Sequence, residues 1–111
     1  MRTLALGGLL GAVLLGGCGP SVPEMNRQAA SEFEIGHVDK AETLLREVLA
    51  RAPSDPDALF YMGRVMQAQG KFVQAIGFYK QCLDADPGYA DARRFLVKAQ
   101  EEAGIKPEPR R

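Results

Sequence analysis

The fold is decided by the stretch "PDALFYMGRVMQAQGKFVQAIGFYKQCLDADP", residues 56–87. Apolar residues recur in it at helical spacing over two segments, 56–69 and 72–85. Gly63 and Ala75 are small residues that let the two helices of a hairpin approach closely. The stretch therefore predicts an antiparallel pair of helices.

The ends of the helices carry their own signals. Pro56 follows Asp55, which marks a helix start because aspartate caps free N–H groups and proline suits the first helical position. Gly36, Gly70 and Gly104 each follow an apolar periodic segment, as a glycine just beyond a helix end does. Together these signals predict five helices, near residues 23–35, 38–51, 56–69, 72–85 and 89–103. No strand-like alternation interrupts them, so the fold class is all-α.

The pattern of this stretch recurs on both sides of it. A shift of 34 residues aligns glycines, prolines, alanines and apolar residues with one another along the chain. The matched sets are Gly36, Gly70 and Gly104; Ala41 and Ala75; Pro53 and Pro87; Leu49 and Leu83; Val38 and Phe72; and Ala29, Gly63 and Val97. A fixed period of this length is the signature of stacked helical hairpins.

The repeat resembles the tetratricopeptide repeat family. The signature slots of that family hold Leu59, Met62, Gly63, Met66, Ala75, Tyr79, Cys82 and Pro87 in residues 56–87. Residues 22–53 match less well, with Gln28 and Glu32 in slots that are normally apolar, and residues 90–104 supply a first helix only. The resemblance implies a right-handed α-α superhelix over residues 23–104. It would contain two full repeats, about 22–55 and 56–89, a partial repeat at 90–104 as a capping helix, and a disordered tail at 105–111.

The same resemblance implies a binding surface. Tetratricopeptide folds bind an extended peptide or a partner helix along the concave face, which the first helix of each repeat lines. By position this groove should include Asn26, Ala30, Phe33, Phe60, Tyr61, Arg64, Gln67, Arg94 and Lys98. Aromatic anchors beside arginine are favoured at binding hot spots. The plainer alternative is that some of these residues form a solvated helix face and that Phe33 or Phe60 belongs to the core.

The N-terminal segment "MRTLALGGLLGAVLLGGC" has a different character from the rest of the chain. A positive start precedes an apolar run of roughly a dozen residues, too short to span a bilayer but suited to a secretory signal. Leu15, Gly16, Gly17 and Cys18 resemble a bacterial lipobox, in which the cysteine thiol takes the lipid and the leader is cut before it. The resemblance implies a cleaved signal peptide at 1–17, a lipidated (palmitate-bearing) Cys18, and a short tether over residues 18–22. An uncleaved anchor, or a chance cysteine after a signal peptide, is the alternative.

Composition excludes several classes of function. Removing residues 1–17 removes Arg2 as the only charged side chain, which leaves 13 basic and 14 acidic residues and no general attraction to nucleic acid. The chain has one histidine, no CxxC or HExxH pattern and no phosphate-binding glycine loop, so we expect no metal, no cofactor and no enzyme. Cys82 takes a slot that usually holds alanine and should be a buried small residue; His37 should be an exposed turn residue.

The expected function is that of a membrane-anchored adaptor or assembly factor, similar to pilotins, which binds a protein or peptide partner. The expected location is the bacterial envelope, with Gly19 after the cysteine favouring the outer membrane and its periplasmic side. The alternative function is structural: a homo-oligomer built by end-to-end stacking of the repeats.

Overall fold

The computed structural model describes residues 19–107, which contain five α-helices and no strand. The helices are α2 (Val22–Glu34), α3 (Val38–Arg51), α4 (Pro56–Ala68), α5 (Phe72–Ala85) and α6 (Ala90–Glu102). Each helix begins and ends within one residue of the predicted bounds. The all-α helical repeat fold is confirmed. The predicted signal peptide, Cys18 and residues 108–111 of the predicted tail lie outside the described residues.

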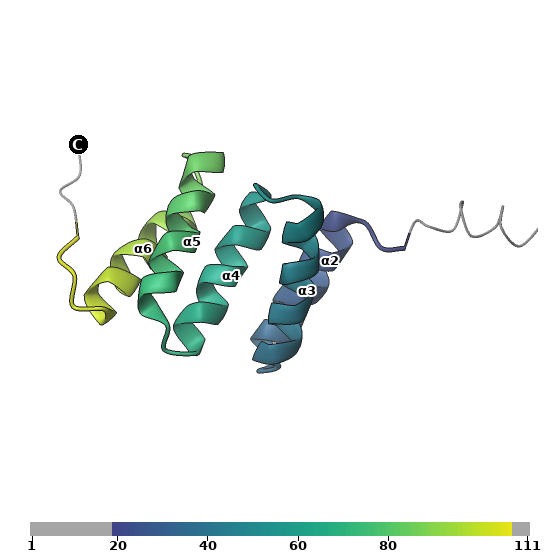
Figure 1. Cartoon of the computed structure of the whole chain (residues 1–111), viewed down its shortest axis with the longest axis horizontal. Coiled ribbons are helices and arrows are strands. Elements are labelled where there is room, and N and C mark those ends of the chain that lie inside the picture. The colour runs from purple at the N-terminus through teal and green to yellow at the C-terminus, as the bar shows by residue number, and fades with distance from the viewer. Residues whose placement is uncertain (1–18, 108–111) are drawn as a thin grey trace, which may run out of the picture.

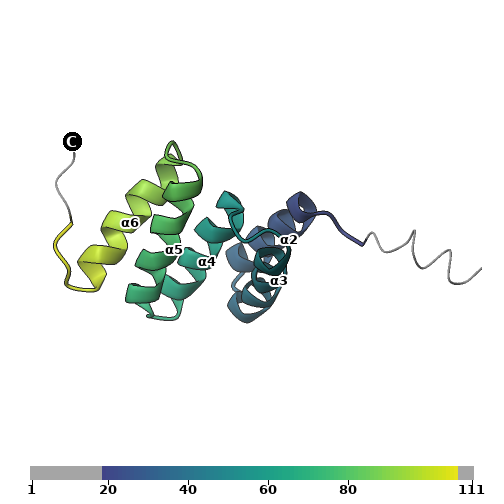
Figure 2. The ribbon, with the colours of Figure 1, turned by 45° about the horizontal axis from the view of Figure 1, so that its top comes forward.

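The helices stack as two hairpins and a single helix. The hairpins α2–α3 and α4–α5 lie side by side, and α6 lies at the far end of the stack (Figures 1 and 2). The first helices of the repeats touch one another, α2 with α4 and α4 with α6, whereas α3 and α5 do not touch within this range. The first helices therefore line the inner, concave side, and the second helices lie outside.

Capping residues explain where the helices begin and end. The Ser21 hydroxyl accepts from the Glu24 backbone N–H at 3.2 Å, and the Glu24 carboxylate accepts from the Ser21 N–H at 3.0 Å, a complete capping box. Asp55 caps α4 by accepting from the Ala58 N–H at 3.0 Å. At the other ends, Gly36, Gly70 and Gly104 have φ of 96°, 78° and 76°, a left-handed conformation that other residues adopt at a cost.

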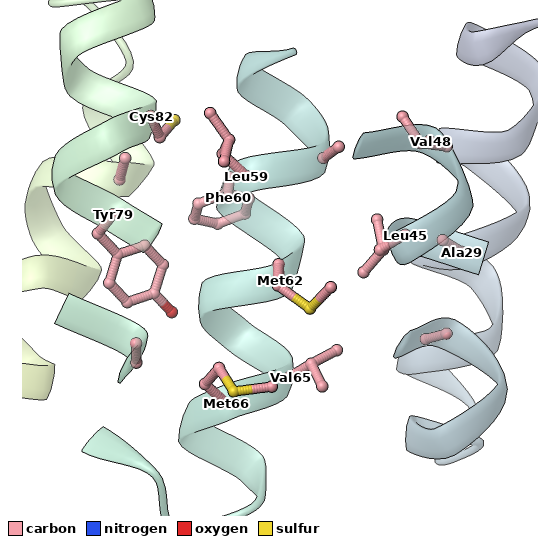
Figure 3. Close-up of a cluster of buried hydrophobic side chains, with 14 of the residues drawn as sticks. Ala29, Leu45, Val48, Leu59, Phe60, Met62, Val65, Met66, Tyr79 and Cys82 are labelled. Carbon is pink, nitrogen blue, oxygen red and sulfur yellow. The ribbon is translucent and has the colours of Figure 1, made fainter. Parts of the chain in front are cut away.

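The core is centred on α4. This helix buries residues on all its sides except the one that carries Tyr61, Arg64 and Gln67. In Figure 3, Met62 and Val65 point toward α3, whereas Phe60 and Met66 point toward α5. A helix apolar around most of its circumference is a central element with neighbours on both sides.

Gly63 shows how closely the second hairpin packs. A Cβ placed on Gly63 would lie 2.4 Å from Cε1 and 2.7 Å from Cδ1 of Tyr79. The Tyr79 ring is fully buried, so the ring fills the space that the glycine leaves. The predicted close approach of the two helices at this position is confirmed.

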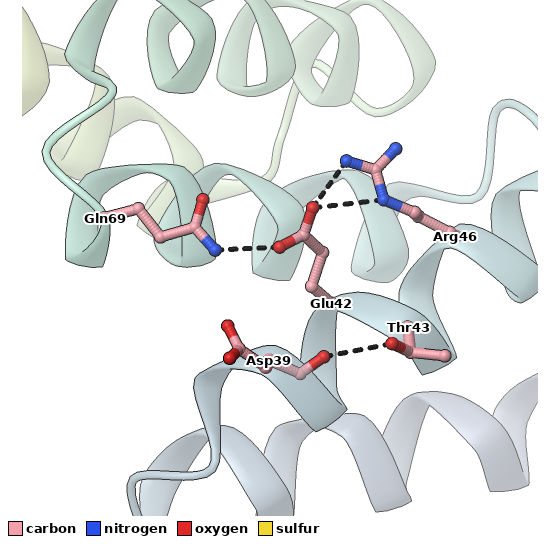
Figure 4. A network of polar contacts seen from close by, with 5 residues as sticks. All are labelled: Asp39, Glu42, Thr43, Arg46 and Gln69. Atoms are coloured by element: carbon pink, nitrogen blue, oxygen red, sulfur yellow. Dashed lines mark hydrogen bonds and ion pairs between the residues drawn. The ribbon is translucent and has the colours of Figure 1, made fainter.

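Polar side chains join the first hairpin to the second. Glu42 of α3 accepts from Gln69 Nε2 at 2.7 Å and from Arg46 Nε at 3.0 Å (Figure 4). The hydrogen bond from Gln69, followed by that from Arg46, lowers the pKa of the Glu42 carboxyl. The bond to Gln69 ties α3 to the end of α4, across the boundary between the two repeats.

The residues that precede α2 are held against the fold. Arg51, at the end of α3, donates from Nη2 to the Pro20 carbonyl at 3.2 Å and from Nη1 to the Met25 sulfur at 3.0 Å. With Ser21 already engaged in the capping box, both residues that directly precede α2 are held by hydrogen bonds. No helix within residues 19–107 combines the length and the apolar character needed to cross a membrane.

Candidate functional site

A hollow of about 230 Å³ opens on the concave side, between the three first helices. Its lining residues come from each of them: Phe33 of α2; Arg64, Gln67 and Ala68 of α4; and Phe95, Lys98 and Glu102 of α6. Four of the predicted groove residues, Phe33, Arg64, Gln67 and Lys98, meet here. The hollow combines two aromatic walls with charges of both signs.

Arg64 lies at the centre of this hollow. Its guanidinium carbon is 4.8 Å from the ring centroid of Phe33 and 4.8 Å from that of Phe95, so it contacts rings from the first and the third repeat. Arg64 Nη1 also pairs with Glu34 Oε2 at 3.2 Å. Its side chain remains 26% exposed. Cation–π contacts of this kind orient a guanidinium while its remaining N–H groups stay free to donate to a ligand.

Gln67 connects the hollow to the core. Its Oε1 accepts from the Tyr79 hydroxyl and its Nε2 donates to Glu102 Oε1 at 2.6 Å. Burial raises the pKa of the Tyr79 hydroxyl, which therefore stays protonated and keeps donating. The hydrogen bond from Tyr79 thereby orients the Gln67 amide, and the amide in turn orients the Glu102 carboxylate.

Two predicted groove residues are buried instead. Phe60 is 4% exposed and Asn26 is 8% exposed, so neither lines an open surface. The two residues occupy the same repeat position, which faces the start of the next repeat. Asn26 Nδ2 donates to Asp55 at 2.7 Å, and the Phe60 ring lies 5.2 Å from the ring of Tyr89. Both contacts are structural, and the expectation that these residues face a partner is corrected.

Three predicted residues remain: Ala30 is half-buried on α2, and Tyr61 and Arg94 lie beside the rings of the hollow. Tyr61 is half-buried and packs edge-on against Phe33 and Phe60, with ring centroids 6.3 and 5.1 Å apart. Arg94 is exposed; it pairs with Asp91 and lies 5.7 Å from the Phe95 ring centroid. Arg94 is exposed because no described helix follows α6 to cover the repeat position that buries Asn26 and Phe60.

Phe95 and Glu102 line the hollow but are not among the predicted groove residues. Phe95 lies 34 residues after Tyr61, so the repeat period that placed Tyr61 at the groove also points to Phe95. Glu102 lies four residues after Lys98, on the same face of α6. Both signals were available in the sequence.

The described residues hold no arrangement typical of a metal centre. Among residues 19–107 no three His, Cys, Asp or Glu side chains are close enough to bind one ion. Cys82 is fully buried, its thiol lies 3.3 Å from the Pro56 carbonyl, and burial raises its pKa to about 12. His37 is exposed in the α2–α3 turn, and its Nδ1 lies 2.7 Å from Glu32 Oε1. Both residues are placed as the sequence predicted.

Comparison with known sequences agrees with this geometry. The sequence profile described as "Tetratricopeptide repeat" matches residues 26–90. The chain belongs to the tetratricopeptide repeat family. Repeats of this family are scaffolds for protein–protein interaction, and the predicted recognition of the family is confirmed.

Curated relatives match about two thirds of this chain and a small part of their own length. The chain is 32% identical over 66 residues to "Protein adenylyltransferase fic-1" of Caenorhabditis elegans, which covers 60% of this chain and 13% of that protein. It is 33% identical over 75 residues to human "Aspartyl/asparaginyl beta-hydroxylase", which covers 65% of this chain and 10% of that protein. The chain thus spans about a tenth of the length of these relatives.

Proposed function

We propose that this protein is a lipid-anchored adaptor of the bacterial envelope that binds an extended segment of a partner protein in the concave hollow. The observation that carries the proposal is the position of Arg64. Its guanidinium is held between Phe33 and Phe95, and an exposed ammonium group, that of Lys98, lies on the same surface.

The chemistry of the hollow favours a mixed ligand. The rings of Phe33 and Phe95 would accept an apolar side chain, whereas Arg64 and Lys98 would donate to a backbone carbonyl or a carboxylate. Glu102 and Glu34 border the same surface and would disfavour a strongly acidic segment. The expected ligand is therefore an extended peptide with alternating apolar and polar groups. It is not a polyanion, and no role with nucleic acid is proposed.

Site-specific photo-crosslinking tests the groove. A photoreactive residue in place of Lys98 should give discrete adducts with envelope proteins, and the same residue in place of Lys80, which is exposed on the outer helix α5, should not. Adding Arg64→Ala to the Lys98 variant should abolish the adducts. Equal adducts from both positions, or adducts that persist without Arg64, would show that another surface binds the partner.

The anchor is proposed from the lipobox-like residues 15–18 and supported by the way the fold begins. Because Arg51 holds the Pro20 carbonyl, only Gly19 separates the ordered fold from Cys18. The sequence alone allowed a tether of about five residues, or at most ~17 Å. A lipid on Cys18 would thus keep the helical stack close to the bilayer surface.

Mass spectrometry of the mature N-terminus tests the anchor in the native host. A diacylglyceryl group on Cys18, with residues 1–17 absent, is expected, and Cys18→Ala should release the protein from the membrane fraction. An unmodified Cys18 would overturn the anchor and leave the groove proposal standing. Separation of inner and outer membranes then tests the proposed outer-membrane location, and protection from protease added to intact cells tests the periplasmic side. Capture of an assembly component in the crosslinking experiment would support a pilotin-like role.

A further inference from the structure

One face of α6 is covered by no helix in the described range. At 100° per residue, Ala90, Arg93, Val97 and Glu101 fall on one narrow stripe of α6. All four are exposed, and Val97 is 38% exposed although it is a large apolar residue. In both ribbon views α6 lies at the end of the stack (Figures 1 and 2). This stripe points away from the side that carries Lys98 and Glu102, so it is separate from the concave hollow.

The repeat register shows what this face corresponds to. Arg93 and Val97 lie 34 residues after Leu59 and Gly63, which face the second helix of their hairpin and are buried. On α6 a charged residue replaces the leucine and a branched one replaces the glycine. This face of α6 therefore corresponds in position to a surface that binds a second helix, but its side chains differ in charge and size.

We infer that the stripe on α6 binds a second copy of this chain, with the two α6 helices antiparallel about a two-fold axis at Val97. The charges on the stripe carry the inference. Arg93 lies four residues before Val97 and Glu101 four residues after it. An antiparallel partner centred on Val97 therefore places Arg93 opposite the partner's Glu101, and the partner's Arg93 opposite Glu101. Neither residue forms an ion pair with any residue between 19 and 107.

The packing of the existing hairpins allows this arrangement. The two helices of a hairpin are antiparallel, so each α6 would take the place of the second helix in the other copy's third hairpin. At the central position of the hairpins, glycine meets tyrosine in the second repeat, and the corresponding pair in the first repeat is Ala29 with Leu45. Small residues are thus matched with large ones. A symmetric α6 pair would instead bring together two valines, each of intermediate size, whose summed volume is slightly larger than that of either hairpin pair.

The dimer proposed here differs from end-to-end stacking. An antiparallel α6 pair uses the same surface on both copies and closes after two chains, whereas stacking of one end on the other would continue into fibres. The two α2 helices would lie at the far ends of the pair, because α2 is at the opposite end of the stack from α6 (Figure 1). Both concave hollows would remain open.

Charge reversal gives a test that only this symmetry satisfies. Residues 19–111 are used, since the five described helices and the buried core that they form lie within them. Sedimentation equilibrium between roughly 1 µM and 1 mM, a range suited to a small interface, should show a monomer–dimer equilibrium for the wild type. Arg93→Glu and Glu101→Arg should each raise the dissociation constant at least about tenfold, because two attractive pairs become repulsive. A mixture of the two variants should form a heterodimer, since the charges then match again.

Lys98→Glu is the matched control. It makes the same change of charge on the same helix but on the groove side, so the dimer should persist. The double variant Arg93→Glu/Glu101→Arg should also dimerise like the wild type, which separates charge pairing from damage to α6. A wild type that stays monomeric at every concentration would overturn the inference, and so would a mixture of the single variants that forms no heterodimer.

Discussion

Gly63 and Tyr79 occupy adjoining space, so neither residue can change without affecting the other. Gly63 has no Cβ, and the buried Tyr79 ring lies where a Cβ would be. In most helices alanine is more stable than glycine by about 1 kcal/mol. Here the overlap reverses the preference, because the ring cannot leave a filled core.

Gly63→Ala should therefore destabilise the protein by about 1–2 kcal/mol, the cost of overpacking less the gain in helix propensity. Gly77→Ala is the matched control, because Gly77 is also in a helix but a Cβ there would meet no atom within 4 Å. Gly77→Ala should stabilise by up to about 1 kcal/mol. Urea denaturation of both variants measures the difference. Equal effects at the two glycines would contradict the packing described here.

Cys82 should be chemically silent in the folded protein. It is fully buried and its pKa is raised to about 12 by burial, with smaller contributions from Asp86 and Asp57. In a chain with Cys18→Ala, a thiol reagent should therefore react only as fast as the protein unfolds.

The same thiol should affect how stability depends on pH. Since the folded pKa of Cys82 lies above the ordinary 9.0, the neutral thiol contributes stability that is complete below pH 9 and is lost as the pH rises toward 12. In the Cys82→Ala variant, the free energy of unfolding should fall less steeply with rising pH over that interval. In the labelling experiment, rapid reaction of Cys82 in the native protein would show that the thiol is accessible to solvent.

The junctions between repeats use two different chemistries at one position. Between α2 and α4 the contact is the hydrogen bond from Asn26 to Asp55, and between α4 and α6 it is the contact of the tilted Phe60 and Tyr89 rings. The Tyr89 hydroxyl in turn donates to Asp57 at 2.7 Å. A polar pair in one junction and an aromatic pair in the other thus connect a first helix to the start of the next first helix.

Asn26→Asp tests the polar junction, because it replaces the donor by a second carboxylate beside Asp55. We expect a loss of about 2 kcal/mol at pH 7 from repulsion between like charges and from the lost hydrogen bond. The repulsion raises the pKa of the pair above that in the unfolded chain, so stability relative to the wild type should recover as the pH falls below about 5. Asn26→Ser, which removes the amide and adds no charge, should show no such recovery. Thermal unfolding at several pH values measures both variants.

The course of the helices could be predicted from the sequence, whereas part of the groove could not. Asp55, Pro56 and the glycines at 36, 70 and 104 act locally, so their effect on helix ends can be read without knowing the rest of the fold. Asn26 and Phe60 depend on which neighbour covers them. The 34-residue repeat places both residues on first helices. Whether their side chains face the groove or the junction with the next repeat depends on the angle between successive repeats.

At the scale of the whole molecule, α6 completes the aromatic core. The Phe60 ring lies 5.5 Å from Phe95 as well as 5.2 Å from Tyr89, and Tyr79 lies 6.2 Å from Phe95. Without α6 these rings would be exposed to water on one side. A short repeat protein has few interfaces to share that cost.

A chain that ends at residue 88 should therefore lose cooperative unfolding and bind a hydrophobic dye, whereas a chain that ends at residue 107 should unfold like the full-length protein. Circular dichroism during heating distinguishes the two outcomes. Unchanged cooperativity in the shorter chain would mean that the two hairpins are stable without the third first helix.

The contact between Arg51 and Pro20 has a consequence for proteolysis. Proteases cut most readily at exposed, flexible segments that can extend through their clefts. With Ser21 in a capping box and Pro20 held by Arg51, Gly19 is the only residue between Cys18 and the first residue held by a hydrogen bond. If Cys18 carries lipid, an envelope protease would find no stalk to cut, and the helical stack could not be shed from the membrane as a soluble fragment while it remains folded.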